Sequence, residues 1–142
     1  MSAKSIQSQN CFVCGSENPI GLNVPFICDS ESASAEFTPG SDYCGFDGIV
    51  HGGILFTLVD EAMMHLIHSN EIKAITSEIK IRMKTFARAN EKLRVTANSL
   101  NAGRHLVKCS AEISGPTGAI VCRAEGKFLY YTEDQPFKKS GL

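Results

Sequence analysis

The 142-residue chain has no excess of positive charge and no long uninterrupted apolar run. Its 14 lysines and arginines nearly balance 15 aspartates and glutamates, so the net charge of −1 argues against nucleic-acid binding, which needs a basic surface. No segment has the roughly 18 consecutive apolar residues of a membrane-spanning helix. Residues 1–10 are polar and lack the apolar core of a signal peptide. We therefore expect a cytoplasmic protein with no nucleic-acid or membrane partner.

The chain has six cysteines but only one Cys-x-x-Cys motif. Without an export signal we expect reduced thiols, and Cys109 and Cys122 alternate with apolar residues as core positions do. Cys11 and Cys14 have the spacing of two zinc ligands, but a zinc ribbon needs a second pair, and only isolated cysteines follow. The sequence thus predicts no metal site and no cofactor, and whether Cys11 and Cys14 bind a metal stays open.

The segment around which the chain is organised runs from His51 to Ile67 and is the longest apolar stretch in the sequence. A helix that begins near Gly52 presents a very wide apolar surface and a narrow stripe opposite it. The stripe consists of Thr57, Asp60, Glu61, Met64 and His68. A helix so nearly apolar all round is expected in the middle of a fold. Its two carboxylates need a partner or a function there, because burying a charge is costly.

Segments that alternate apolar and polar residues flank this helix. One strand or a short hairpin is expected over residues 26–37 before the helix, with a turn at 29–31, and longer strands are expected at 75–86, 91–100, 105–113 and 119–132 after it. One long helix is available to cover the sheet, so we predict an α+β fold in which a curled antiparallel sheet of about five to six strands wraps around it. Residues 1–142 form one domain in this prediction, with 1–10 frayed and 133–142 a polar tail.

Several motifs together resemble the hotdog-fold thioesterases of the PaaI-like superfamily. They are His51-Gly52-Gly53, Leu58-Val59-Asp60-Glu61-Ala62, the strand Thr76-Ser77-Glu78-Ile79-Lys80-Ile81-Arg82-Met83, and the entry Asn18-Pro19-Ile20-Gly21-Leu22. The resemblance covers roughly residues 11 to 131. It implies the hotdog fold, a homodimer or homotetramer, and hydrolysis of acyl-CoA thioesters. Many relatives carry an asparagine or glutamine in the loop before the histidine, where this chain has Gly45.

The candidate catalytic groups lie at the start and in the middle of the predicted helix. Gly52 and Gly53 offer backbone N–H groups that lack intrahelical partners and can polarise a thioester carbonyl. The alternative is that they only permit close packing. Asp60 is the candidate general base or nucleophile, and the alternative is a structural carboxylate paired with a cation. The helix propensity that two adjacent glycines cost favours the catalytic interpretation of Gly52 and Gly53, and the resemblance favours that of Asp60.

The spacing of these groups predicts an assembly. Gly53 and Asp60 are seven residues apart, about 10 Å along one helix. An oxyanion donor and a base must instead lie near the same carbonyl. If both groups are catalytic, Gly53 of one subunit must face Asp60 of another. The sequence therefore predicts a two-fold dimer with composite active sites, possible also within a tetramer.

Four more residues are secondary candidates. The resemblance implies that Thr76 orients the attacking water and that His51 donates to the thioester or supports the loop, although both could be structural. Arg88 and Arg104, on predicted turns, are candidates for binding the phosphates of CoA. The absence of Gly-x-Ser-x-Gly argues against a serine triad. We expect an acyl-CoA thioesterase, with a non-catalytic acyl-CoA-binding hotdog protein as the alternative; the sequence does not specify the acyl group.

Overall fold

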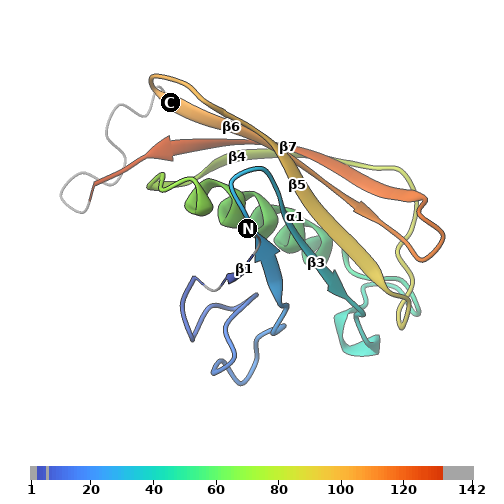
Figure 1. Ribbon diagram of the computed structural model, residues 1–142. Helices are drawn as coiled ribbons and strands as arrows, with labels where there is room; N and C mark the ends of the chain where they lie inside the picture. The colour runs from blue at the N-terminus through green and yellow to red at the C-terminus, as the bar shows by residue number, and fades with distance from the viewer. Residues whose placement is uncertain (1–2, 6, 133–142) are drawn as a thin grey trace.

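One long helix lies against a curved antiparallel sheet in the computed structural model, which describes residues 3–5 and 7–132 (Figure 1). The helix is α1 (Gly52–Ser69). The strands are β1 (Ala3–Ser5), β2 (Phe26–Cys28), β3 (Ala33–Phe37), β4 (Ala74–Met83), β5 (Leu93–Ala102), β6 (Leu106–Ser114) and β7 (Ile120–Tyr130), and a short 3₁₀ helix, η1 (Ser41–Tyr43), precedes α1. Their spatial order is β1-β2-β3-β5-β6-β7-β4, with every neighbouring pair antiparallel. The predicted fold class is confirmed.

Alternation of apolar and polar residues located the strands well. The ranges predicted for β4 to β7 agree with the observed ones to within three residues at each end. In β6, for example, Val107, Cys109, Ala111 and Ile113 are buried while the residues between them are not. Such alternation follows from a sheet with one face on the core and one toward solvent.

The sheet has seven strands rather than five or six because the N-terminus adds a short one. Ala3 pairs with Cys28 and Ser5 with Phe26. Residues 3–5 therefore form a strand, whereas they were expected to be frayed. The physical reason is that β2 would otherwise be an edge strand with unpaired backbone groups, which a further strand can satisfy. The predicted polar tail at 133–142 lies outside the described residues.

The core lies between α1 and the concave face of the sheet. The helix contributes Leu55, Leu58, Val59, Ala62, Met63, Leu66 and Ile67, none more than 3% exposed. Over β7 the packing leaves no room for a side chain at Gly126, because an added Cβ atom would lie 2.6 Å from the Phe128 ring and 3.1 Å from Met63 Sδ. None of the helices that the described residues form could span a bilayer.

The segment between β1 and β2 covers one flank of α1 (Figure 1). It buries Val13, Cys14, Leu22 and Val24 and is closed by backbone hydrogen bonds such as Val24 N–H to Val13 O at 2.7 Å. The opposite flank of α1 is only partly covered, because Thr57, Asp60 and Met64 are half-buried and Phe56 is 38% exposed. The helix therefore has one flank sealed by the chain itself and one that remains accessible.

Candidate functional site

The accessible flank of α1 begins with a capped N-terminus. His51 is the N-cap residue, and its Nδ1 accepts a hydrogen bond of 2.8 Å from the Gly53 N–H. The Gly52 N–H has no hydrogen-bond partner among residues 3–5 and 7–132. Helix N-termini carry unsatisfied donors and a partial positive charge. The open donor in this structure is therefore Gly52, whereas Gly53 was the predicted catalytic donor.

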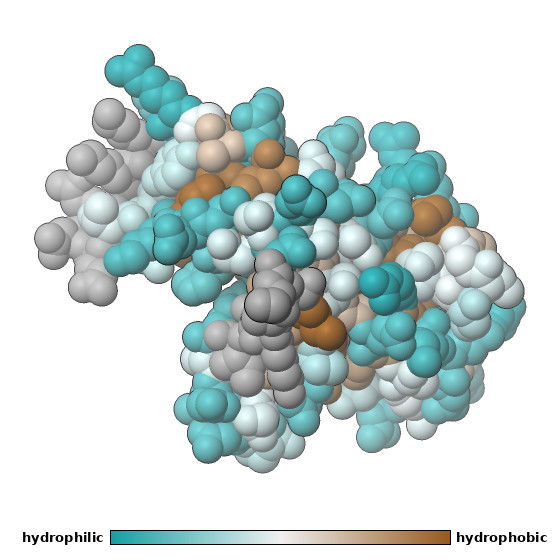
Figure 2. Space-filling view, viewed as in Figure 1, coloured by the Kyte–Doolittle hydropathy of each residue, from teal (hydrophilic) through white to brown (hydrophobic). Residues whose placement is uncertain are grey.

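An open cavity of about 560 Å³ lies beside this helix terminus. Its walls come from the loop before α1, from the start of α1 and from the end of β4, and include Gly45, Gly52 and Leu55. Three further lining residues, Phe46, Met83 and Phe86, are large apolar side chains that are 45–81% exposed. Figure 2 shows apolar surface, in brown, at this end of the molecule. The cavity can accept a largely apolar group whose polar end reaches the Gly52 N–H.

Asp60 lies two turns further along α1, on the same accessible flank. It is half-buried, and its Oδ1 accepts a hydrogen bond of 2.7 Å from Thr76 Oγ1 at the start of β4. Burial raises the pKa of Asp60; the Thr76 hydrogen bond acts in the opposite direction and the nearby charge of Glu61 adds to the increase. A carboxylate with a raised pKa is more basic, and with Oδ1 bound to Thr76 its second oxygen, Oδ2, is the one that can accept a proton.

The donor and the carboxylate do not meet within one chain. Gly52 and Asp60 are eight residues apart on a continuous helix, which corresponds to about 12 Å along its axis. Eight residues also correspond to a rotation of about 80° around the helix axis. Thus the structure joins Asp60 to Thr76 and groups His51 with both glycines, but keeps these two clusters apart.

The two candidate arginines lie at different ends of the sheet. Arg88 is exposed, and its backbone pairs with Ile49, a lining residue of the cavity. Arg104 is exposed in the turn between β5 and β6, where Tyr130 Oη donates a 2.6 Å hydrogen bond to Gly103 O. Within one chain only Arg88 is near the cavity.

Glu61 departs from its predicted place in the polar stripe. It is 6% exposed and contacts Cys11 of the N-terminal segment, because that segment folds over this flank of α1. Cys11 Sγ donates to Glu61 Oε2 at 3.1 Å, and His65 Nε2 lies 3.3 Å from the same oxygen. Burial opposes ionisation of Glu61, yet hydrogen bonds from His65 and from the thiols of Cys11 and Cys14 outweigh it and lower the pKa of Glu61.

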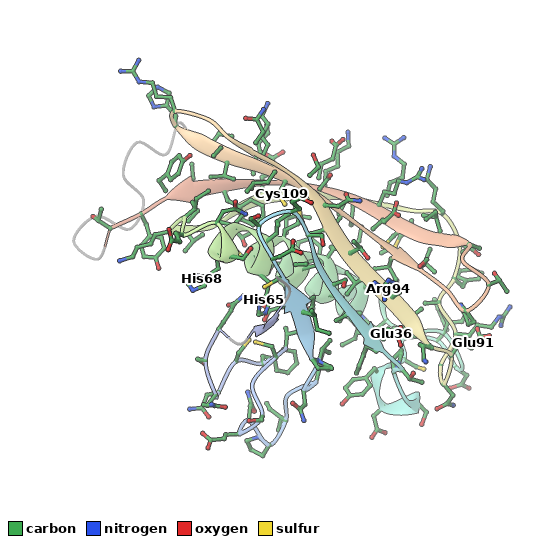
Figure 3. The ribbon with its side chains drawn as sticks, in the orientation of Figure 1. Glu36, His65, His68, Glu91, Arg94 and Cys109 are labelled. Atoms are coloured by element: carbon green, nitrogen blue, oxygen red, sulfur yellow. The ribbon has the colours of Figure 1, made fainter. Side chains whose placement is uncertain are left out.

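This buried cluster was missed by sequence reasoning. His65 stacks on Phe26 with ring centroids 4.7 Å apart, and Figure 3 shows it pointing from α1 toward the N-terminal segment while His68 points outward. Burial also raises the pKa of the Cys14 thiol to about 12. The Glu61–His65 spacing of one helical turn was a visible signal, but its partner Cys11 is 50 residues away in the sequence.

A family model described as the thioesterase superfamily matches residues 47–122. Over 104 residues the chain is 26% identical to a protein of Archaeoglobus fulgidus named "Putative esterase", covering 73% of this chain and 68% of that protein. The solved structure of the PaaI protein of E. coli, from the phenylacetic acid degradation operon, is 25% identical with a TM-score of 0.72, over 76% of this chain and 83% of that one.

A hypothetical thioesterase of Streptococcus pneumoniae solved with coenzyme A has a TM-score of 0.69 at 19% identity, over 72% of this chain and 80% of that one. Two variants of the streptococcal protein, each at a TM-score of 0.70 and 18% identity, cover 74% of this chain and 86–87% of theirs. In one variant alanine replaces a threonine and in the other an aspartate, at positions 16 residues apart.

Proposed function

The chain belongs to the thioesterase superfamily, and from this premise we propose that it hydrolyses acyl-CoA thioesters to a free acid and CoA. In the proposed reaction the thioester carbonyl lies at the Gly52 N–H, and Asp60 is the base that activates water. The observation that carries the proposal is the half-buried Asp60, fixed by Thr76 on the accessible flank of the helix.

The substrate class is supported by the relatives and by the cavity. The streptococcal thioesterase was solved with coenzyme A, and an acyl-CoA is the thioester of that carrier. The cavity at the start of α1 is lined mainly by apolar groups, as an acyl chain or a pantetheine arm requires. Arg88, exposed beside this cavity, is the better placed of the two arginines to contact a phosphate of CoA.

The chemistry needs one donor, one base and water. Water attacks the carbonyl carbon while Asp60 accepts its proton, and the resulting oxyanion is stabilised by the Gly52 N–H at the positive end of the helix dipole. The carbon–sulfur bond then breaks, and the proton held by Asp60 passes to the CoA thiolate. Direct attack by Asp60 to form an anhydride, which water then hydrolyses, uses the same two groups.

The spacing of the streptococcal variants supports the pairing of Asp60 with Thr76. The positions substituted in that protein, an aspartate and a threonine, are 16 residues apart. Asp60 and Thr76 have the same separation and share a 2.7 Å hydrogen bond.

Two subunits are needed to complete this site. We place α1 antiparallel to its copy about a two-fold axis. If this axis passes residue 56, midway between residues 52 and 60, Gly52 of one protomer faces the partner subunit's Asp60. Phe56 occupies that position and is 38% exposed, as a large apolar residue at the centre of an interface would be in the separate subunit. We therefore include a homodimer with two composite sites in the proposal.

The test is release of free thiol from a panel of acyl-CoAs of increasing chain length, measured for the wild type and Asp60→Asn. We expect turnover by a dimeric wild type and none by the variant, which should remain a dimer by size-exclusion chromatography. Wild-type turnover in Asp60→Asn would overturn the role of Asp60. A fully active monomer would overturn the composite site.

A non-catalytic acyl-CoA-binding protein is the second candidate, and one observation favours it. Gly45 lies beside the His51 ring, where an added Cβ would be 3.4 Å from His51 Cδ2, so this position places no amide side chain at the cavity. Calorimetry with the same acyl-CoAs distinguishes the candidates, because tight binding without thiol release at any chain length supports this one.

A further inference from the structure

Three metal-ligating side chains meet on the sealed flank of α1. The Sγ atoms of Cys11 and Cys14 and a carboxylate oxygen of Glu61 all lie within 4.8 Å of one another. Cys14 and Glu61 are buried and Cys11 is half-buried. The ligands of a tetrahedral zinc ion, at about 2.0–2.3 Å from the metal, are themselves separated by less than this limit. The three atoms are therefore close enough to one another to share one ion.

We propose that Cys11, Cys14 and Glu61 bind a structural zinc ion that fastens the N-terminal segment to α1. Sequence reasoning required a second Cys-x-x-Cys pair for such a site, but here the third ligand comes from the helix. The site lies under the N-terminal segment, and none of its three ligands lines the Gly52 cavity. The proposal does not depend on thioester hydrolysis.

The backbone around the cysteines is arranged as thiolate ligands need. The Gln7 N–H donates to Cys14 Sγ at 3.3 Å, and the Cys14 N–H points at Cys11 Sγ at 3.5 Å. Hydrogen bonds from backbone amides to sulfur stabilise the negative charge of a thiolate and orient it. The loop is wound so tightly that a Cβ on Gly15 would lie 2.5 Å from both Cys11 N and Gln9 O.

The carboxylate is also held in place. His65 Nε2 lies 3.3 Å from Glu61 Oε2, and the His65 ring is itself fixed by stacking on Phe26 at 4.7 Å. A ligating carboxylate that is hydrogen-bonded by a neighbouring group is a usual feature of metal sites. His65 is therefore a positioning residue for Glu61, and the half-buried Cys11 leaves the fourth coordination position to water.

The donor set selects the metal. Two thiolates exclude the hard ions Mg²⁺ and Ca²⁺, which prefer oxygen ligands. The carboxylate disfavours Cu⁺, and an iron–sulfur cluster needs more thiolates than these two. Zn²⁺ accepts sulfur and carboxylate ligands in one tetrahedral site. On binding, the two thiols release their protons to solvent.

The test measures zinc in the full-length chain, without a histidine tag and without chelator, by plasma mass spectrometry after dialysis. We expect one zinc per chain in the wild type, and below one-tenth in Cys11→Ser and in Glu61→Gln. Cys44→Ser is the matched control, because Cys44 is also a half-buried free cysteine but lies outside the cluster. It should retain one zinc.

Two further measurements do not depend on the folding of a variant. X-ray absorption at the zinc edge of the wild type should show two sulfur atoms at about 2.3 Å. Removing the metal with a chelator should lower the Tm by about 5 °C or more, with recovery when Zn²⁺ is added back. The proposal is overturned if the wild type reconstituted with Zn²⁺ holds none after dialysis, if Cys11→Ser retains a full equivalent, or if the bound zinc has no sulfur ligand.

Discussion

Replacing Gly52 with proline should remove the proposed oxyanion donor while leaving the fold intact. Gly52 is the first residue of α1, a position where proline is favoured because its missing N–H has no intrahelical acceptor. The preceding His51 has φ −59° and ψ 135°, the extended conformation that a residue before proline adopts. A Cβ at Gly52 would lie 3.7 Å from Met83 Cε, an ordinary contact. The substitution therefore isolates one N–H group.

The expected effect follows from the role of that group. Loss of one oxyanion donor costs about 10²–10³ in kcat, or about 2.7–4 kcal/mol of transition-state stabilisation. The Tm should not fall, because proline also restricts the unfolded chain. The assay is thiol release from the best acyl-CoA of the panel, with kcat and KM determined separately and Tm measured on the same samples.

Gly52→Ala is the matched control, because it adds the side-chain carbon and keeps the N–H. We expect its activity to stay within about fivefold of the wild type, since its Cβ makes only the contact with Met83. The reasoning is refuted if folded, dimeric Gly52→Pro turns over within fivefold of the wild type. It is also refuted if alanine lowers kcat as much as proline does.

Three further substitutions test the carboxylate and the packing around it. Burial raises the pKa of Asp60 in the folded protein. The stability that Asp60 contributes is therefore present below its ordinary pKa of about 3.9 and is lost as pH rises through its pKa in the folded state. The Tm of Asp60→Asn should accordingly exceed that of the wild type by more at pH 8 than at pH 4. Thr76→Val removes the 2.7 Å hydrogen bond, which should lower the free energy of unfolding by about 1–2 kcal/mol and, by raising the pKa of Asp60 further, move the acid limb of kcat/KM to higher pH. Thr76→Ser should restore both, and an unchanged pH profile in Thr76→Val would contradict the proposed role of Asp60. Gly126→Ala, whose Cβ meets the Phe128 ring at 2.6 Å, should cost about 1–3 kcal/mol in denaturant unfolding. Gly40→Ala is the control and should cost less than about 0.5 kcal/mol, because its Cβ would have no described atom within 4 Å beyond its own residue and its two chain neighbours.

Local patterns were sufficient to predict most of the fold. The helix and the long strands have periodicities of 3.6 and 2 residues, and each can be read from a few neighbouring side chains. The short strand β1 could not be predicted in this way, because Ala3–Ser5 is polar and small and is a strand only through its pairing with β2. Its formation depends on an edge that exists only after the sheet is assembled.

The candidate site was predicted in part, for similar reasons. The motif located His51, both glycines and Asp60, yet the choice between Gly52 and Gly53 depends on where the His51 side chain points. The 2.8 Å bond from the Gly53 N–H to His51 Nδ1 leaves Gly52 as the open donor. Side-chain torsions of this kind have no signature in the sequence.

The buried cluster shows the same limit over a longer range. A helical wheel placed Glu61 in the narrow stripe opposite the apolar surface of the helix, because the wheel takes no account of a segment 50 residues earlier in the chain. The N-terminal segment instead folds over that flank and brings Cys11 to 3.1 Å from Glu61. Contacts between distant segments that bury polar groups can be found only from the folded structure.

The central claim, that each active site combines groups from two subunits, is tested most directly with a hybrid dimer. Asp60→Asn and Gly52→Pro are each expected to inactivate a homodimer. In a heterodimer that carries one substitution on each subunit, one composite site has both an intact Gly52 and the partner subunit's intact Asp60. We predict that the purified heterodimer, held together by two different affinity tags, has about half of the wild-type kcat per dimer. A heterodimer as inactive as its two parents would contradict the composite site. That result would mean that each subunit supplies both groups of its own site, so that one site lacks the carboxylate and the other lacks the N–H donor.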